Sequence, residues 1–345
     1  MQRIGAGAYG EVWLARSNAT GALRAAKIVW REKFTDDRPF QREFEGIQRF
    51  ERISREHPSQ LALFHIGRND AEGYFYYVME LADSVENANS HSRNPKAVQS
   101  SKSALPSTIE TPLSDSYKPH TLRADLDDGR LPATRVVEIG VALSEALAHL
   151  HKNGLVHRDV KPSNVIFVNG RPKLADIGLV TDASDQCSIV GTEGYLPPEG
   201  PGTPQADIFA LGKVLYEAAT GLDRRRFAEL PKDLRDWPDQ HSVIELNEVV
   251  LRACAKNSAA RYSTCQEMRD ELLLLQRGKS VKRKRTAQWY WAAGRTVGIA
   301  AGLVVAAVAL ISYWPNSPAG RAALASDGPD STNMEANALC DKAMY

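Results

Sequence analysis

The sequence has almost no surplus charge. Lysine and arginine together number 43 and aspartate and glutamate 42, which leaves a formal net charge of +1 over 345 residues. A general nucleic-acid binder needs a surplus of basic residues to displace counterions, so this class is excluded. Hydrophobic residues make up 43% of the chain, which excludes a wholly disordered protein. The length suits two domains or one large two-lobed domain.

Cysteine is also scarce. The four cysteines, Cys187, Cys254, Cys265 and Cys340, are widely spaced, with no C-x-x-C pair and no histidine cluster at metal-ligand spacing. This excludes a disulfide-stapled scaffold, and we interpret the first three as reduced thiols of a cytosolic domain. The first ten residues contain no apolar core, so we expect no signal peptide, and no internal repeat is found.

The first part of the chain reads as short β-segments and one helix. Residues 10–15 and 22–29 flank a turn at 18–21, which predicts a hairpin. Residues 39–54 carry apolar side chains at intervals of three and four, which predicts a helix, and residues 74–81 form a further β-rich run.

This pattern breaks at residues 84–120, which contain nine serines and four prolines in 37 positions. So little apolar material cannot offset the entropy of ordering, and we predict a mostly disordered insertion. Helical periodicity resumes after it. The predicted helices are 134–152, 207–220, 242–256 and 265–276.

Residues 5–12 fit the pattern G-x-G-x-x-G-x-V, in which glycines let backbone N–H groups approach phosphate oxygens. A glycine-rich turn is more often only a turn, and a dinucleotide-binding loop would need a helix directly after the glycines. A strand is predicted there instead, which favours a phosphate-covering hairpin. Lys27 lies in an apolar strand, where its ammonium needs a carboxylate or phosphate partner. Glu43 is the favoured partner and Glu45 the alternative.

The most specific cluster runs from His157 to Asn164. It places Asp159, Lys161 and Asn164 between two short apolar strands, and Asp176 follows seventeen residues after Asp159. Two Asp-containing turns would be the simpler interpretation, but the order of the clusters favours a binding site. Asn164 and Asp176 offer hard oxygen ligands suited to Mg²⁺, which normally arrives with substrate phosphates.

Together these motifs resemble a eukaryotic-type (Hanks-type) Ser/Thr protein kinase over about residues 3–278. The resemblance implies an α+β, two-lobed fold, with a small β-rich N-lobe at 1–83 and a larger helical C-lobe at 121–278 on either side of the insertion. It also implies ATP and Mg²⁺ as cofactors and protein Ser/Thr hydroxyls as acceptors, including the chain's own.

The resemblance assigns roles to individual residues. Asp159 would orient the substrate hydroxyl and accept its proton, and Lys161 would neutralise charge on the transferring phosphoryl group. Asn164 and Asp176 would bind Mg²⁺. The residues expected around ATP are Gly5, Gly7, Gly10, Val12, Ala25, Lys27 with its partner Glu43, the hinge residues Glu80 and Ala82, and Ile166.

Further positions resemble the end of a kinase activation segment. Thr192 follows Gly191, Glu199 is expected to pair with Arg261, and Asp207 resembles the aspartate that braces the catalytic loop. Ile177 stands where the family usually has Phe, and Pro198 replaces an Ala. Both changes leave the metal and base residues intact. A pseudokinase scaffold remains the alternative, but scaffolds typically lack at least one catalytic residue; a small-molecule phosphotransferase ranks last.

An uncharged stretch from 296 to 320 follows a basic run at 279–285. Residues 297–314 could form a helix of about 27 Å, close to the hydrocarbon core of a membrane, with aromatic residues at both ends. A buried core helix is the alternative. We expect a basic juxtamembrane segment at 279–296, a single-pass membrane helix at 297–314 and a cytoplasmic kinase domain. The tail at 315–345 would lie outside, where Cys340 could link two chains into a homodimer.

Overall fold

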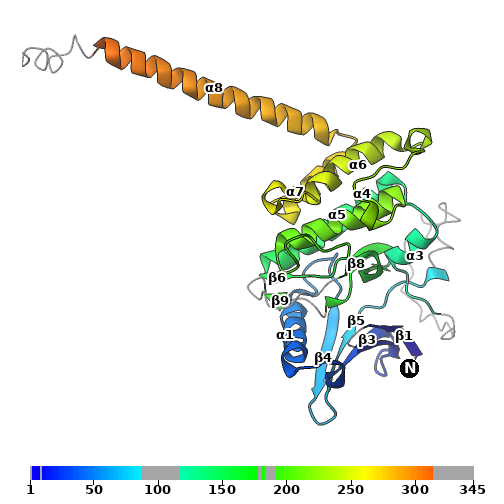
Figure 1. The fold of residues 1–345 in the computed structure, drawn as a ribbon. Helices are drawn as coiled ribbons and strands as arrows, with labels where there is room; N and C mark the ends of the chain where they lie inside the picture. The colour runs from blue at the N-terminus through cyan, green and yellow to red at the C-terminus, as the bar shows by residue number, and fades with distance from the viewer. Residues whose placement is uncertain (1, 8–9, 87–116, 178–180, 183–191, 314–345) are drawn as a thin grey trace, which may run out of the picture. The chain divides into compact units, whose positions relative to one another are not determined.

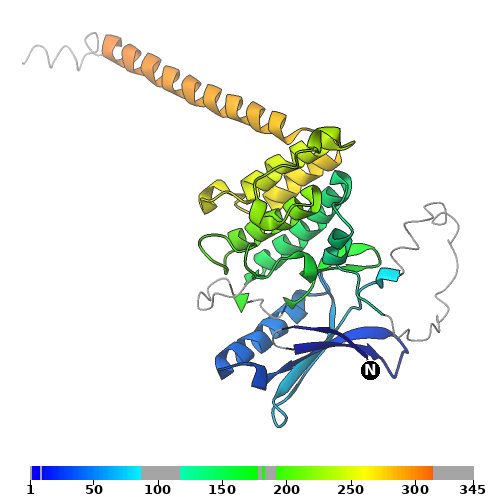
Figure 2. The ribbon, with the colours of Figure 1, turned by 45° about the vertical axis from the view of Figure 1, so that its right-hand side comes forward.

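The computed structural model describes residues 2–7, 10–86, 117–177, 181–182 and 192–313 (Figure 1). The chain divides into two compact units, Met1–Val281 and Lys282–Tyr345. In Figures 1 and 2, the blue sheet and helix form one lobe of the first unit, and the green and yellow helices form the other. The predicted two-lobed α+β architecture is confirmed.

A five-stranded antiparallel sheet in the order β1-β2-β3-β5-β4 forms the N-terminal lobe. The strands are β1 (Gln2–Ala6), β2 (Gly10–Arg16), β3 (Leu23–Trp30), β4 (Leu63–Asn69) and β5 (Tyr74–Met79). Lys27 lies at the middle of the sheet, because it pairs with Val12 of β2 and with Tyr77 of β5. Strand β4 was not predicted from the sequence, because its residues are mostly half-buried or exposed and lack strict alternation.

Helix α1 (Asp37–Ile53) packs its apolar side chains, including Phe40 and Phe50, into the same cluster as Phe75 of the sheet. It begins two residues before the predicted start. The Asp36 side chain accepts a hydrogen bond from the N–H of Arg38 and caps the helix. Pro39 is tolerated just inside because the first turn has no partner for its N–H groups.

The second lobe is helical around a central, almost fully buried α5. Its helices are α3 (Leu122–Asp127), α4 (Ala133–Lys152), α5 (Pro204–Thr220), α6 (Gln240–Ala253) and α7 (Cys265–Gln276). A small hairpin pairs β7 (Val165–Val168) with β8 (Arg171–Leu174), and a separate two-stranded antiparallel sheet pairs β6 (Leu155–Val156) with β9 (Thr181–Asp182). The short 3-10 helices are Arg31–Lys33, Pro162–Asn164, Arg224–Arg226, Leu234–Asp236 and Ser258–Ala260.

Both ends of the predicted insertion belong to the folded lobe. Ser84 forms an antiparallel bridge with Pro119, and His120 N–H donates a hydrogen bond to the Asp83 carbonyl. The predicted boundaries of 84 and 120 are therefore too wide, since backbone pairing orders both margins. Residues 87–116 lie outside the described residues.

The second unit contains α8 (Val281–Tyr313), whose first residue closes the first unit. This helix covers most of the predicted juxtamembrane segment and all of the predicted membrane span except residue 314. Among the residues that the structure describes, no helix is both long and apolar enough to cross a membrane.

Candidate active site

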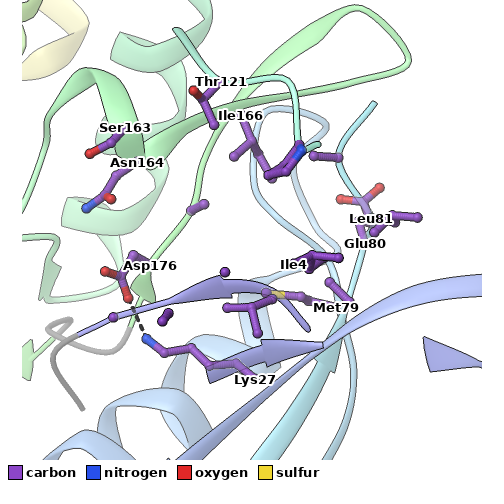
Figure 3. Close-up of a pocket in the computed structure, with 18 of the residues that line it drawn as sticks. Ile4, Lys27, Met79, Glu80, Leu81, Thr121, Ser163, Asn164, Ile166 and Asp176 are labelled. Atoms are coloured by element: carbon purple, nitrogen blue, oxygen red, sulfur yellow. Dashed lines mark hydrogen bonds and ion pairs between the residues drawn. The ribbon is translucent and has the colours of Figure 1, made fainter. Parts of the chain in front are cut away.

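A cavity of about 510 Å³ lies between the glycine-rich hairpin and sheet on one side and the segment 159–176 on the other (Figure 3). The predicted site residues that line it are Gly5, Gly7, Val12, Ala25, Lys27, Glu43, Glu80, Ala82, Asp159, Lys161, Asn164, Ile166 and Asp176. Residues more than 170 positions apart in the chain thus meet around one space. The tertiary structure brings the separate motifs together.

Gly10 is the predicted site residue that does not line this cavity. A Cβ atom on Gly10 would stand 2.3 Å from the carbonyl oxygen of Ile28, so a glycine is required for the close approach of β2 to β3. Its carbonyl also accepts a hydrogen bond of 2.8 Å from Gly7 N–H, which closes the hairpin turn. Gly10 therefore shapes the hairpin.

Lys27 lies between two carboxylates. Its Nζ atom is 2.5 Å from Oδ1 of Asp176 and 4.0 Å from Oε1 of Glu43 (Figure 3 draws the Asp176 contact). Burial would lower the pKa of Lys27, but the acidic neighbours Tyr77, Asp176 and Glu43 outweigh burial and raise that pKa. The ammonium is therefore kept charged at the centre of the cavity.

The structure places Glu43, and not Glu45, on the buried face of α1 towards Lys27. Glu43 is 4% exposed, whereas Glu45 is exposed and accepts a hydrogen bond from Gln41. Burial raises the pKa of Glu43 to about 7, although Lys27 acts in the opposite direction. The carboxyl group thus changes its charge near neutral pH.

Asp159 is surrounded by three polar side chains. Its Oδ1 accepts a hydrogen bond of 2.8 Å from the Thr192 hydroxyl, and its Oδ2 lies 2.7 Å from Lys161 Nζ. Asn164 Nδ2 donates to the same Oδ2 and to the Asp159 backbone carbonyl, each at 2.9 Å. Lys161 Nζ in turn donates to the Thr192 hydroxyl at 2.9 Å. This network holds the Asp159 carboxylate in one position, in contact with the Lys161 side chain.

Asp207 holds the backbone of the catalytic loop, the cluster from His157 to Asn164, in place. Its carboxylate accepts hydrogen bonds of 2.8 and 2.9 Å from the backbone N–H groups of His157 and Arg158 and lies 2.8 Å from His151 Nε2. Burial opposes ionisation, but the contacts with the two histidines outweigh it and lower the pKa of Asp207. Arg158 has a φ of 70°, a left-handed conformation that is costly for a non-glycine residue and that these bonds offset.

The Asn164 and Asp176 side chains lie on the same side of the cavity (Figure 3). Asn164 uses its Nδ2 atom for Asp159, so its amide oxygen remains for another partner. Burial would raise the pKa of Asp176, but Lys27, His157 and Lys161 outweigh burial and lower it. An amide oxygen and an ionised carboxylate are a donor set that fits Mg²⁺.

The opposite end of the cavity is mainly apolar, with Val12, Ala25, Met79 and Ile166 in its wall. The side chain of Glu80 is engaged elsewhere: its Oε2 atom lies 2.6 Å from Lys173 Nζ and accepts a hydrogen bond from Ala62 N–H. A flat apolar ligand could lie between these walls with its edge towards the backbone of the hinge, residues 80–82.

Several residues that line the cavity lie outside the predicted site, among them Tyr77, Tyr117 and Thr121. Tyr77 belongs to the β-rich run predicted at 74–81, and no residue type or spacing there marks it as facing a cavity. Tyr117 and Thr121 lie at the end of the Ser/Pro-rich segment and inside no motif.

Glu199 and Arg261 form the expected ion pair, with Arg261 Nη2 donating to Oε2 at 2.9 Å. The Arg261 side chain is fully buried. Burial opposes ionisation of Glu199, but the Arg261 hydrogen bond lowers its pKa. Between Asp176 and Glu199, residues 178–180 and 183–191 lie outside the described part of the chain.

Comparison with known proteins gives one family. Residues 1–273 match the protein kinase domain. Over 173 residues the chain is 34% identical to the serine/threonine-protein kinase PknB of Mycobacterium leprae, covering 44% of this chain and 28% of that protein. It is 29% identical to a probable serine/threonine-protein kinase PknB of Corynebacterium glutamicum over 303 residues, which are 79% and 41% of the two chains.

A third relative is the serine/threonine-protein kinase PrkC of Bacillus subtilis, 27% identical over 297 residues. The match covers 78% of this chain and 39% of PrkC. The chain thus spans less than half the length of the relatives it matches.

Proposed function

We propose that this chain, because it belongs to the protein kinase family, transfers the γ-phosphoryl group of Mg·ATP to serine and threonine hydroxyls of proteins. Members of this family use ATP and Mg²⁺. The observation that carries the proposal is the arrangement around Asp159, whose carboxylate is held by Thr192, Lys161 and Asn164 at the edge of a cavity large enough for a nucleotide.

The residues that line the cavity have separate proposed roles in the transfer. Lys27, held towards the cavity by its carboxylate neighbours, would bind phosphate oxygens once these replace Asp176 as its partner. Asn164 and Asp176 would hold Mg²⁺, which neutralises charge on the phosphates when bound. Asp159 would orient the acceptor hydroxyl and take its proton, and Lys161 would face the transferring phosphoryl group.

Serine and threonine are the proposed acceptors because Lys161 and Thr192 resemble the pattern of Ser/Thr-specific kinases. The hydrogen-bonded triangle of Asp159, Lys161 and Thr192 supports this, since it brings both residues of that pattern into contact with the candidate base. The chain's own hydroxyls are included among the proposed substrates.

The test is incorporation of labelled γ-phosphate by the full-length chain in the presence of Mg²⁺. Asp159→Asn should lower turnover by about 10²- to 10⁴-fold, because it removes the proton acceptor while keeping the shape of the side chain. Asp70→Asn is the matched control, since Asp70 is an exposed residue paired with Arg68. Equal incorporation by wild type and D159N would contradict the proposal and favour the scaffold alternative.

We also propose, from the sequence, that the chain is anchored in a membrane by residues 297–314 with its kinase domain in the cytoplasm. The basic residues 279–295 favour this orientation, because positive charge is enriched on the cytoplasmic side. Large apolar side chains of α8, among them Leu303, Val305 and Val308, are exposed. Among the described residues, however, no helix is long and apolar enough to cross a membrane.

Membrane fractionation with protease protection tests this localisation. The full chain should pellet with membranes, and a variant lacking 297–314 should be soluble. Recovery of the full chain in the soluble fraction, or digestion of the kinase domain from outside intact cells, would contradict the anchor and leave the catalytic proposal standing. A Cys340-linked homodimer would appear as a dimer on a non-reducing gel that Cys340→Ser abolishes.

A further inference from the structure

Three hydrogen-bonding side chains form a row that leads from the catalytic loop into the helical lobe, and each belongs to a different helix (Figure 1). Asp207 lies on α5, His151 near the end of α4 and Cys265 at the first position of α7. The Asp207 carboxylate lies 2.8 Å from His151 Nε2, and His151 Nδ1 lies 3.7 Å from the Cys265 sulfur. The imidazole is therefore in contact at both nitrogens.

Water has little access to these three side chains. Asp207 and Cys265 are each 1% exposed, and the His151 side chain is 10% exposed. The start of α7 is fixed by packing, because Cys265 and Met268 belong to the same apolar cluster as Leu147 of α4. Loss of the thiol would thus leave the Nδ1 atom of His151 buried and without a partner, which is costly for a polar group.

The two outer groups determine which imidazole nitrogen carries the hydrogen. Burial would raise the pKa of Asp207, but its contact with His151 and the charge of His157 outweigh burial and keep the carboxylate ionised. An ionised carboxylate only accepts hydrogen bonds, so Nε2 of His151 is the donor. Burial raises the pKa of the Cys265 thiol, and the charge of Asp207 acts in the same direction. The thiol therefore keeps its hydrogen and donates to Nδ1.

Both contacts favour the same state of the His151 ring. In a neutral imidazole one nitrogen donates and the other accepts, and here Nε2 faces an acceptor while Nδ1 faces a donor. A ring turned by 180° about its bond to Cβ would place carbon atoms at both positions and lose both hydrogen bonds. The thiol thus adds a second contact that favours the ring orientation in which Asp207 is bonded.

The orientation of His151 matters to the site because Asp207 holds the catalytic loop. The Asp207 carboxylate accepts hydrogen bonds from the backbone N–H groups of His157 and Arg158, and the next residue is the candidate base Asp159. A carboxylate that the imidazole holds in one orientation keeps these two N–H groups in place. A carboxylate that can turn would let the loop move.

We propose that Cys265 is a positioning residue, which fixes the orientation of His151 and, through Asp207, the placement of Asp159. Cys265 acts from a distance, since it is not among the residues that line the cavity. It also lies outside the kinase motifs of the sequence. This inference rests on the proposed function, because an effect of Cys265 on turnover requires that the site transfers phosphate.

The experiment compares Cys265→Ala with Cys254→Ala in the full-length chain. Cys254 is the matched control, because it is buried in the same apolar cluster and its thiol contacts the Phe209 carbonyl instead of a histidine. C265A should lower kcat by about 3- to 10-fold, the usual effect of one hydrogen bond, and leave the KM for ATP unchanged. C254A should leave kcat unchanged.

Nitrogen-15 NMR of the histidine side chains at pH 8 gives a second readout, which does not depend on activity. In wild type, His151 should carry hydrogen on Nε2 alone, and its Nδ1 signal should be that of an imine nitrogen that accepts a hydrogen bond. In C265A the Nδ1 signal should shift towards that of a free imine nitrogen. In C254A it should stay at the wild-type position, since a loss of packing elsewhere in the cluster does not touch this bond.

The outcomes separate this inference from the proposed function. Wild-type kcat in C265A, or an equal loss of kcat in C254A, would overturn the positioning role. An Nδ1 signal that is the same in wild type and C265A would overturn the hydrogen bond on which the role depends. If wild type transfers no phosphate from Mg·ATP, the proposed function fails, and the Nδ1 signal still decides whether Cys265 holds His151. Thermal melting verifies that both variants are folded.

Discussion

The hydroxyl of Thr192 donates a hydrogen bond of 2.8 Å to Oδ1 of Asp159, 33 residues earlier in the chain. The same hydroxyl accepts a hydrogen bond from Lys161, so a single side chain orients both the candidate base and its neighbouring cation. This contact links the catalytic loop to the end of the activation segment. It makes the position of Asp159 dependent on how that segment folds.

Replacement of Thr192 should therefore act on turnover and not on nucleotide binding. Thr192→Ala removes the hydroxyl, and we expect kcat to fall at least about 10-fold because Asp159 loses an orienting bond. Thr192→Ser should restore most of the activity. The measurement is kcat and the KM for ATP on a peptide or protein substrate. An increase in KM with unchanged kcat would contradict the positioning role.

The pH dependence of stability should reveal the buried carboxyl of Glu43. Its pKa is about 7 in the folded protein against an ordinary value of 4.5, so the folded state holds a proton that the unfolded state releases between these values. Its contribution to stability is therefore most favourable below pH 4.5 and is lost as the pH rises through 7, by up to about 3 kcal/mol.

Glu43→Gln removes this titration. The melting temperature of E43Q should rise relative to wild type between pH 5 and pH 8, while its activity falls because Lys27 loses a charged partner. Glu45→Gln is the matched control on the exposed face of the same helix and should show no such trend. A difference between E43Q and wild type that stays constant across this pH range would contradict the assignment.

Phosphorylation between Asp176 and Glu199 should raise activity. Arg158 adjoins Asp159, so a phosphate group on the segment could form a charge-assisted hydrogen bond with its guanidinium group. Thr181, Ser184 and Ser188 are the candidate hydroxyls, and the last two lie outside the described residues. Mass spectrometry of active protein, before and after phosphatase treatment, measures both occupancy and activity. Fully active protein without phosphate in this segment would remove the hypothesis.

Deletion of residues 90–115 should leave catalysis largely intact. The deletion keeps Tyr117 and the residues on both sides that pair at the hinge, including Ser84 and Pro119. Activity and ATP affinity of the deletion variant are compared with those of the full chain. Loss of activity in a variant whose melting temperature is unchanged would show that the segment takes part in catalysis.

The motifs of the sequence predicted the two-lobed fold through their resemblance to protein kinases, and they named the candidate residues of the site. The glycine hairpin and the cluster from Asp159 to Asn164 are short motifs. They can be identified from residues that are neighbours in the sequence, without knowledge of tertiary contacts. Most helix positions followed from periodicity for the same reason. The α5 helix begins three residues before its predicted start because Thr203 caps it and Pro204 suits the first position.

The tertiary structure decided which side chains share the cavity. Glu43 and Glu45 are both on α1, and only the packing of that helix against the sheet buries the first and exposes the second. The close approach of β3 to β2 requires a glycine at position 10, and the Tyr117 hydroxyl contacts the Ala82 carbonyl although 35 residues separate them in the sequence. These contacts join residues far apart in sequence, and no local pattern encodes them, because burial and hydrogen bonding depend on where the rest of the chain folds.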